Sequence, residues 1–187
     1  MKPEFQAKFL QHLNKKKNSE QGFTLIELLV VIIIIGILAA IALPSLLGQV
    51  NKAKQAEAKN NIGAMNRAQQ AYYLEYQEFT TDLSQLGVGL KTETINYRYT
   101  LIANAGASPT SPPSTIANNA VSLKPTLKSY MGLVGTQYSA GGATTSELLT
   151  VAFACETNLP GLGSAAAPPA TTPLDCPSGY KDLGKTK

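Results

Sequence analysis

The chain has 187 residues, of which 44% are hydrophobic and only 15% are charged, and its formal net charge is +4. That length allows one membrane-spanning helix and one modest domain. The single histidine is His12, and there are two cysteines, so the rest of the chain has no Ser-His-Asp triad, Cys-His pair or histidine-ligated metal site. Most common catalytic chemistry is excluded, and we expect a protein that is not an enzyme and uses no cofactor or metal.

The positive charge is concentrated at the amino terminus. Residues 1–22 carry five lysines against two glutamates, whereas residues 23–187 carry eleven basic and ten acidic side chains. Three of these lysines, Lys15, Lys16 and Lys17, stand shortly before a long apolar run. This pattern fits the positive-inside orientation of a membrane helix better than nucleic-acid binding, which needs a basic patch on the folded domain.

The apolar run opens with Gly22-Phe23-Thr24-Leu25-Ile26-Glu27, and no charged residue follows between Leu28 and Asn51. About 20 apolar residues in a helix span the ~30 Å hydrocarbon core of a bilayer. Glu27 is alone at the start of the run, and a charge in hydrocarbon costs roughly 2.5–3.5 kcal/mol or more, so we expect it to have a functional partner. A secretory signal cleaved near Ala42 and an uncleaved signal anchor are two alternative interpretations of the run.

With a basic segment before it and the apolar run behind it, Gly22-Phe23-Thr24-Leu25-Ile26-Glu27 resembles the class III signal of type IV prepilins, the type IVa class in particular. The resemblance implies that a prepilin peptidase cleaves after Gly22 and N-methylates Phe23. It further implies a single-pass inner-membrane precursor with a cytoplasmic amino terminus. Pilus assembly machinery would polymerise that precursor into an extracellular helical filament of identical subunits. Twitching motility, adhesion and DNA uptake would be properties of the filament, so nucleic acid is a partner only through it.

Glu27 has two interpretations. Thr24-Leu25-Ile26-Glu27 fits a capping box, and an acid in the first turn also suits the helix dipole. The resemblance instead implies filament assembly, in which Glu27 of one subunit meets the new α-amine of Phe23 of the next. Removing one partner of a desolvated pair typically costs about 3–5 kcal/mol, so such a pair would set the register between subunits.

The helical pattern runs from Phe23 to about Tyr76, and we expect the helix to end near Phe79. Gly36 weakens the helix and Pro44 kinks it, either as a simple membrane-helix kink or, as in pilins, around a segment that melts in the filament. Beyond Leu47 the pattern becomes amphipathic. The residues expected to face a sheet are Ile62, Met65, Tyr72 and Tyr76, and those expected on a solvated or subunit-facing surface are Lys52, Lys54, Glu57, Lys59 and Arg67.

The C-terminal part predicts an antiparallel sheet of three or four strands laid across the second half of the helix. Residues 94–103 alternate, with Ile95, Tyr97, Tyr99 and Leu101 on one face. Residues 127–134 and 148–155 are further strand candidates, 104–119 are expected to be an exposed loop, and 139–143 a turn. The fold class is α+β, and it resembles the pilin fold.

Cys155 and Cys176 are the only cysteines. Export places them in an oxidising compartment, where a disulfide is expected, and closing a loop of that size contributes roughly 3 kcal/mol. The pilin resemblance implies the same bond. The Ala/Pro/Thr-rich segment 161–173 is similar to loops of cyanobacterial pilins, and its hydroxyls suit O-linked sugar.

The expected organisation is a leader (1–22), a transmembrane and assembly helix (23–51), an amphipathic half of the helix (52–79) and a C-terminal sheet region (80–187). The leading interpretation is a major pilin, a structural subunit of a type IV pilus. One alternative is a pseudopilin of a type II secretion system, although its major kind usually carries a calcium site in place of a disulfide. The sparse C-terminal acids, Glu156, Asp175 and Asp182, argue against calcium. Another alternative is a membrane-anchored or secreted binding domain that does not polymerise.

Overall fold

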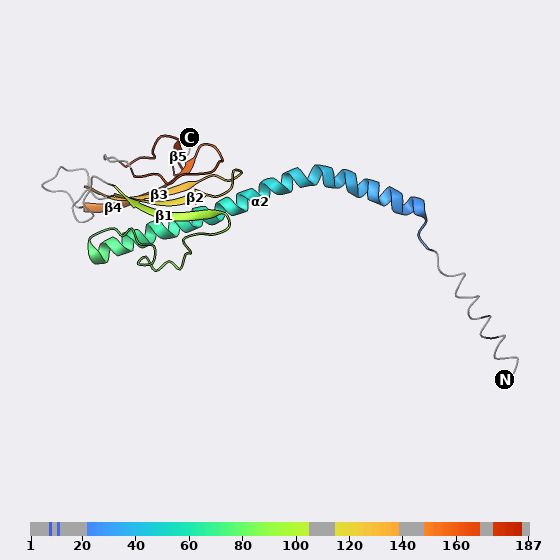
Figure 1. The fold of residues 1–187 in the computed structure, drawn as a ribbon, viewed down its shortest axis with the longest axis horizontal. Coiled ribbons are helices and arrows are strands. Elements are labelled where there is room, and N and C mark those ends of the chain that lie inside the picture. The colour runs from blue at the N-terminus through green and yellow to red at the C-terminus, as the bar shows by residue number, and fades with distance from the viewer. Residues whose placement is uncertain are drawn as a thin grey trace. The chain divides into compact units, whose positions relative to one another are not determined.

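A computed structural model describes residues 8, 11, 22–104, 115–138, 148–168 and 174–184. The chain divides into two compact units, Met1–Leu47 and Gly48–Lys187. Helix α2 (Leu25–Tyr76) contributes to both, and the second unit also holds the sheet (Figure 1). Nearly all of the expected leader lies outside the described residues, as do the expected turn at 139–143 and residues 169–173 of the Ala/Pro/Thr-rich loop.

Helix α2 is 52 residues long and contains Pro44, which agrees with the single long helix that the sequence predicts. It ends at Tyr76, three residues before the predicted end at Phe79. The reason is local, because Gln77 has a φ of 58°, and a left-handed residue ends the helical repeat. The chain then folds back, and the ring of Phe79 packs on that of Tyr73 with centroids 4.9 Å apart.

The second unit contains one antiparallel sheet. Its strands are β1 (Tyr97–Ala103), β2 (Thr115–Ser122), β3 (Tyr130–Tyr138), β4 (Leu148–Thr157) and β5 (Tyr180–Asp182). They lie side by side in chain order, each antiparallel to the next. Five strands in the described residues exceed the three or four that the sequence predicts.

Strand β2 was expected to be part of an exposed loop, and that prediction was wrong for residues 115–119. All eight residues of β2 are buried. The sequence Thr-Ile-Ala-Asn-Asn-Ala-Val-Ser lacks the apolar–polar alternation of a half-buried strand, because both faces of β2 are covered. Its two asparagines are buried with partners, Asn118 donating to Asn66 at 2.9 Å and Asn119 to the carbonyl of Ala166 at 3.0 Å.

Strand β1 begins at Tyr97 rather than at residue 94. Thr94 closes a turn before the strand, since its amide donates to the carbonyl of Tyr97 at 2.8 Å and its hydroxyl accepts the amide of Tyr97 at 3.1 Å. Ile95 therefore lies in the turn and is 83% exposed. It does not share the buried face of Tyr97 and Tyr99, as the alternation had suggested.

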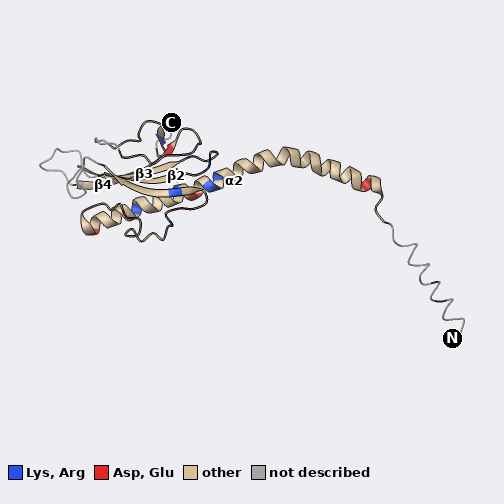
Figure 2. Ribbon diagram, viewed as in Figure 1, with Lys and Arg blue, Asp and Glu red and all other residues tan. Residues whose placement is uncertain are grey.

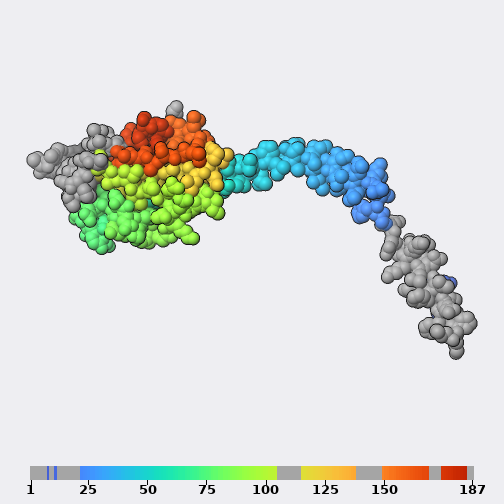
Figure 3. All heavy atoms as spheres, in the orientation of Figure 1, coloured from blue at the N-terminus to red at the C-terminus, as the bar shows by residue number. Residues whose placement is uncertain are grey.

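The sheet is packed on both faces. On one face Ala58, Ile62 and Met65 of α2 form a core with Tyr97, Tyr99, Ala120 and Tyr130. On the other face Ala117, Met131, Leu133 and Cys155 are covered by the C-terminal segment through Ala166, Cys176 and Tyr180. Figure 3 shows this segment, orange to red, on one side of the second unit and the green chain of α2 and the following connection on the other.

The predicted sheet-facing residues of α2 are only partly confirmed. Ile62 and Met65 are fully buried, and Tyr72 packs at the margin of the core. Tyr76 is 59% exposed and rests on the ring of Tyr72, with centroids 4.5 Å apart. It sits on the last residue of α2, beyond the end of the packed surface.

Candidate functional site

The segment expected to be processed and to assemble begins at Gly22. Gly22, Phe23 and Thr24 precede α2, and Phe23 is 87% exposed. The Thr24 amide and hydroxyl both donate to Oε2 of Glu27, at 2.8 and 2.9 Å, and the Glu27 amide donates to the Thr24 hydroxyl at 3.2 Å. These reciprocal bonds are a capping box, which satisfies backbone donors that the first turn otherwise leaves unpaired.

The capping interpretation of Glu27 therefore has direct geometric support. The second interpretation, a pairing with the α-amine of Phe23 in a neighbouring subunit, involves another chain and stays a prediction. The two are compatible, because a capping box uses Oε2 of Glu27 and a carboxylate has a second oxygen with free lone pairs.

The helix behind Glu27 presents an apolar surface in every direction. Its leucine, isoleucine and valine side chains from Leu25 to Leu47 are between 47% and 87% exposed. Part of α2 is long and apolar enough to cross a membrane. Apolar side chains exposed all round a helix are typical of a membrane span or of a helix buried in an assembly.

Gly36 and Pro44 both lie inside α2, within the apolar part. No atom outside the local helix backbone lies within 4 Å of the position that a Cβ on Gly36 would occupy. The expected kink or melting segment at Gly36 and Pro44 stays a prediction.

The disulfide expected from the sequence is present between Cys155 and Cys176, with Cα atoms 5.9 Å apart. Cys155 is buried on β4, and Cys176 lies in the C-terminal segment just before β5. The bond ties this segment to the face of the sheet opposite α2.

A buried carboxylate that the sequence did not single out lies one residue after Cys155. Glu156 is 7% exposed, and its oxygens are 3.5 Å from Lys59 Nζ, 3.2 Å from Lys128 Nζ and 3.3 Å from Lys181 Nζ. Burial would raise the pKa of Glu156, but hydrogen bonds from Lys128 and Lys181 and the charges of Lys128 and Lys59 hold it below its usual range.

This cluster joins α2, the β2–β3 connection, β4 and β5 through one side chain. The sequence predicts Lys59 on a solvated or subunit-facing surface and marks Glu156 only as one of the sparse C-terminal acids. Separations of 25 to 97 positions along the chain give no local pattern, and the register of β4 with β5 pairs Glu156 directly with Lys181.

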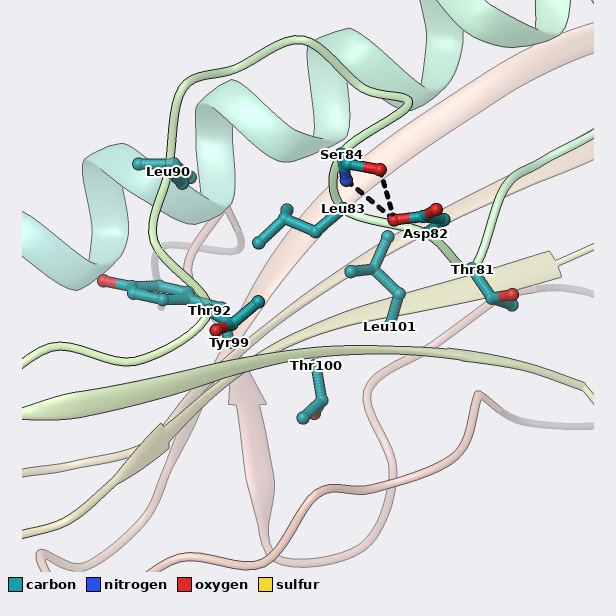
Figure 4. Close-up of a pocket in the computed structure, with 9 residues that line it drawn as sticks. All are labelled: Thr81, Asp82, Leu83, Ser84, Leu90, Thr92, Tyr99, Thr100 and Leu101. Atoms are coloured by element: carbon teal, nitrogen blue, oxygen red, sulfur yellow. Dashed lines mark hydrogen bonds between the residues drawn. The ribbon is translucent and has the colours of Figure 1, made fainter.

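A hollow of about 500 Å³ lies between the connection after α2 and strand β1 (Figure 4). Asp82 in it is already engaged, since its Oδ1 accepts the amide and the hydroxyl of Ser84 at 2.9 and 2.7 Å. Among the residues that the structure describes, none of those lining the hollow is a histidine, cysteine or lysine. The lining residues are Thr81, Asp82, Leu83, Ser84, Leu90, Thr92, Tyr99, Thr100 and Leu101.

Two family models match the chain. The type IV pilin-like G and H family matches residues 55–177, which is more than half of the chain. The prokaryotic N-terminal methylation motif matches residues 17–43 and so includes Gly22, Phe23 and Glu27.

Similar proteins include a type IV major pilin, a fimbrial protein and a type II secretion system protein. The type IV major pilin protein PilA of Myxococcus xanthus is 40% identical over 46% of this chain and 39% of its own length. The fimbrial protein EcpC of Eikenella corrodens is 41% identical over 44% of this chain and 52% of its own length. The type II secretion system core protein G of Aeromonas hydrophila is 41% identical over 35% of this chain and 46% of its own length.

The matches thus span about half or less of the length of these relatives. No solved structure matches the chain.

Proposed function

We propose that this chain, which belongs to the type IV pilin-like family, is the structural subunit of a type IV pilus, held in a membrane as a precursor and then polymerised through its apolar helix. The observation that carries the proposal is the combination of an N-terminal methylation motif with a helix whose apolar side chains are exposed on all sides. Such a surface is stable only in lipid or against other helices.

The leader in this proposal is residues 1–22. A prepilin peptidase cleaves after Gly22 and methylates Phe23, which leaves an amine next to the first turn of α2. The five lysines of residues 1–22 favour a cytoplasmic amino terminus by the positive-inside rule. Residues 23–51 then cross the inner membrane, and residues 52–79 and 80–187 form the exported part.

Assembly in this proposal uses Glu27 twice. Within one subunit it caps α2 through Thr24. Between subunits its free carboxylate oxygen meets the amine of Phe23 on the next subunit, where both charges are removed from water. A pair of that kind selects one axial register, because any other register leaves a charge unpaired in an apolar core.

The test separates capping from charge pairing. Glu27→Gln keeps an acceptor for the capping box but removes the charge, whereas Thr24→Ala weakens the box and keeps the charge. We expect Glu27→Gln and Glu27→Ala both to reduce sheared surface filaments strongly while cleavage after Gly22 continues, and Thr24→Ala to retain filaments. Normal filament yield from Glu27→Gln, seen by electron microscopy, would reduce the role of Glu27 to capping.

A second candidate function is supported by the relatives named type II secretion system core protein G in Aeromonas hydrophila and Vibrio cholerae. In that case the chain is a pseudopilin of a secretion machine. Mass spectrometry of surface filaments separates the two. A pilus subunit is the main component of long sheared filaments and begins with methylated Phe23, and a pseudopilin is absent from them while secretion fails without it.

A further inference from the structure

One end of the second unit is both apolar and basic. We call it the basal end, and it comprises four segments that hydrogen bonds hold together: residues 52–59 of α2, 94–96, 123–129 and 158–163. Tyr130 Oη donates to Gln55 Oε1 at 3.1 Å, which fixes α2 against the start of β3. The amide of Leu123 donates to the carbonyl of Asn96 at 2.9 Å, and that of Gly161 to the carbonyl of Leu127 at 3.0 Å.

Three large apolar side chains at the basal end face solvent. Ile95 is 83% exposed, Leu159 is 79% exposed and Leu162 is 73% exposed. They come from segments that hydrogen-bond to the β2–β3 connection, and none belongs to the buried clusters of the second unit. Single exposed apolar residues are ordinary. Here three of them lie at one end of the unit, and that end also carries an excess of positive charge.

Exposed or half-exposed lysines outnumber acids at this end. Lys52, Lys54, Lys59 and Lys124 are at least partly exposed, against Glu57 as the exposed acid. Figure 2 shows basic residues on α2 where the helix enters this unit. Glu156 is buried and faces three lysines, so it leaves the local charge positive.

The short stretch of helix after the apolar run limits how far the first residues of the basal end can lie from a bilayer that holds the run. Lys52 is five residues after Leu47, and Gln55 is eight residues after it, which at 1.5 Å per residue is about 8 and 12 Å along a helix. The headgroup layer on each side of the hydrocarbon core is about 5–8 Å thick. Because α2 is continuous over these residues, Lys52 can lie no farther than about 8 Å along the helix from the end of the apolar run, which is within one Debye length at physiological salt.

We propose that the basal end binds the anionic lipid surface of the membrane that holds the precursor, with Ile95, Leu159 and Leu162 inserted at the headgroup level and the lysines against lipid phosphates. This inference depends on the proposed function in requiring the membrane-held stage. Lysines near an anionic surface are attracted to it, and apolar side chains add affinity by entering the interface. When the subunit leaves the membrane and joins a filament, the basal end loses its lipid contacts and gains contacts with other subunits.

The test uses the absence of tryptophan from the sequence. Leu159→Trp and Leu162→Trp each place one reporter at the basal end. Leu74→Trp is the matched control, because Leu74 is 73% exposed and is 19 residues beyond Gln55 on α2, about 29 Å away along the helix. The full chain is reconstituted in vesicles of phosphatidylcholine, with or without phosphatidylglycerol, whose acyl chains are brominated near the glycerol end.

We expect bromine to quench most of the emission of Leu159→Trp and Leu162→Trp in anionic vesicles and little of that of Leu74→Trp. Lys52→Glu combined with Lys124→Glu should weaken the quenching, as should 1 M salt, which shortens the Debye length to about 3 Å. Arg67→Glu, an exposed charge farther along α2, should leave it unchanged.

Three outcomes would overturn the inference: no quenching at residues 159 and 162, equal quenching in neutral and anionic vesicles, or a shift of emission that follows protein density in the vesicles and is insensitive to bromine. The last outcome would mean that the basal end contacts a second copy of this chain and not lipid. Flotation of the chain with the vesicles is measured in parallel. Failure to float overturns the membrane stage of the proposed function, whereas flotation without quenching overturns this inference alone.

Discussion

The side chain of Asn119 on β2 pairs with the backbone of Ala166 as a strand would. Its Nδ2 donates to the Ala166 carbonyl at 3.0 Å, and its Oδ1 accepts the Ala166 amide at 3.2 Å. Asn119 is 1% exposed. One buried amide thus holds the C-terminal segment against the face of the sheet opposite α2.

We expect Asn119→Ala to lower the free energy of unfolding by about 1–3 kcal/mol, because it removes two hydrogen bonds and leaves the Ala166 backbone groups without these partners. The measurement is urea unfolding of the full chain in detergent. Asn60→Ala is the control, since Asn60 is exposed on α2 and alanine favours a helix. Equal unfolding midpoints for Asn119→Ala and the wild type would contradict the role of this pair.

A second prediction concerns the close approach of Gly132 on β3 to Asn66 on α2. A Cβ on Gly132 would clash with Oδ1 of Asn66 and lie 2.7 Å from its Cγ. Asn66 cannot move without losing its bonds to the carbonyl of Phe153 and from Asn118. We therefore expect Gly132→Ala to destabilise the second unit by about 1–3 kcal/mol.

Gly161→Ala provides the matched control, because no atom lies within 4 Å of the corresponding Cβ position. Thermal unfolding of the two variants gives the comparison. A Gly132→Ala protein as stable as Gly161→Ala would mean that α2 and β3 separate at little cost, and the tight packing at Gly132 would have no energetic weight.

The contacts of Asn119 and Asn66 show why some parts of the fold can be predicted from the sequence and others cannot. The long helix and the disulfide follow from local or pairwise features: an apolar run that starts with a capping box, and two cysteines in an exported chain. Strand β2 does not, because Asn118 and Asn119 are typical loop residues and become strand residues only when Asn66 and Ala166 supply their partners. The prediction for Ile95 was wrong because the apolar alternation with Tyr97 continues in the sequence beyond the end of the strand. Ile95 lies in the turn that Thr94 closes.

The candidate site also has one part that can be predicted from the sequence and one part that cannot. Gly22, Phe23 and Glu27 lie within six consecutive residues, so their motif can be recognised from the sequence alone. The environment of Glu156 is assembled from four separate elements, and no spacing rule connects them.

Glu156 leads to a prediction about pH. The pKa of Glu156 is held below its usual range in the folded chain, against about 4.3 when unfolded. Its contribution to stability is therefore present in full above the unfolded pKa and is lost as the pH falls through the folded value. We expect Glu156→Gln to cost about 1.5–3 kcal/mol at neutral pH, the scale of hydrogen bonds to a charged group.

The difference in unfolding free energy between the wild type and Glu156→Gln should shrink as the pH is lowered below about 4.3. Glu78→Gln is a control for a carboxylate outside this cluster. A difference that stays constant from neutral to acidic pH would show that shape, and not the charge of Glu156, stabilises the contact with Lys59, Lys128 and Lys181.

The disulfide gives the last prediction. Strand β5 pairs with β4 through only three residue pairs, of which Cys155 with Asp182 is the first. The bond from Cys155 to Cys176 therefore carries much of the attachment of the C-terminal segment. Reducing it should lower the free energy of unfolding by roughly 3 kcal/mol, the chain-entropy value for a loop of about 21 residues.

The loss should be local first. After reduction we expect the amides of β5 to exchange with deuterium much faster while those of β2 and β3, which are paired on both sides, keep their protection. The Cys155→Ala, Cys176→Ala double variant should show the same pattern without reductant and no further change with it. Uniformly faster exchange across all five strands would instead mean that the sheet and the C-terminal segment unfold as one unit, because attachment of that segment would then be a condition for the stability of every strand.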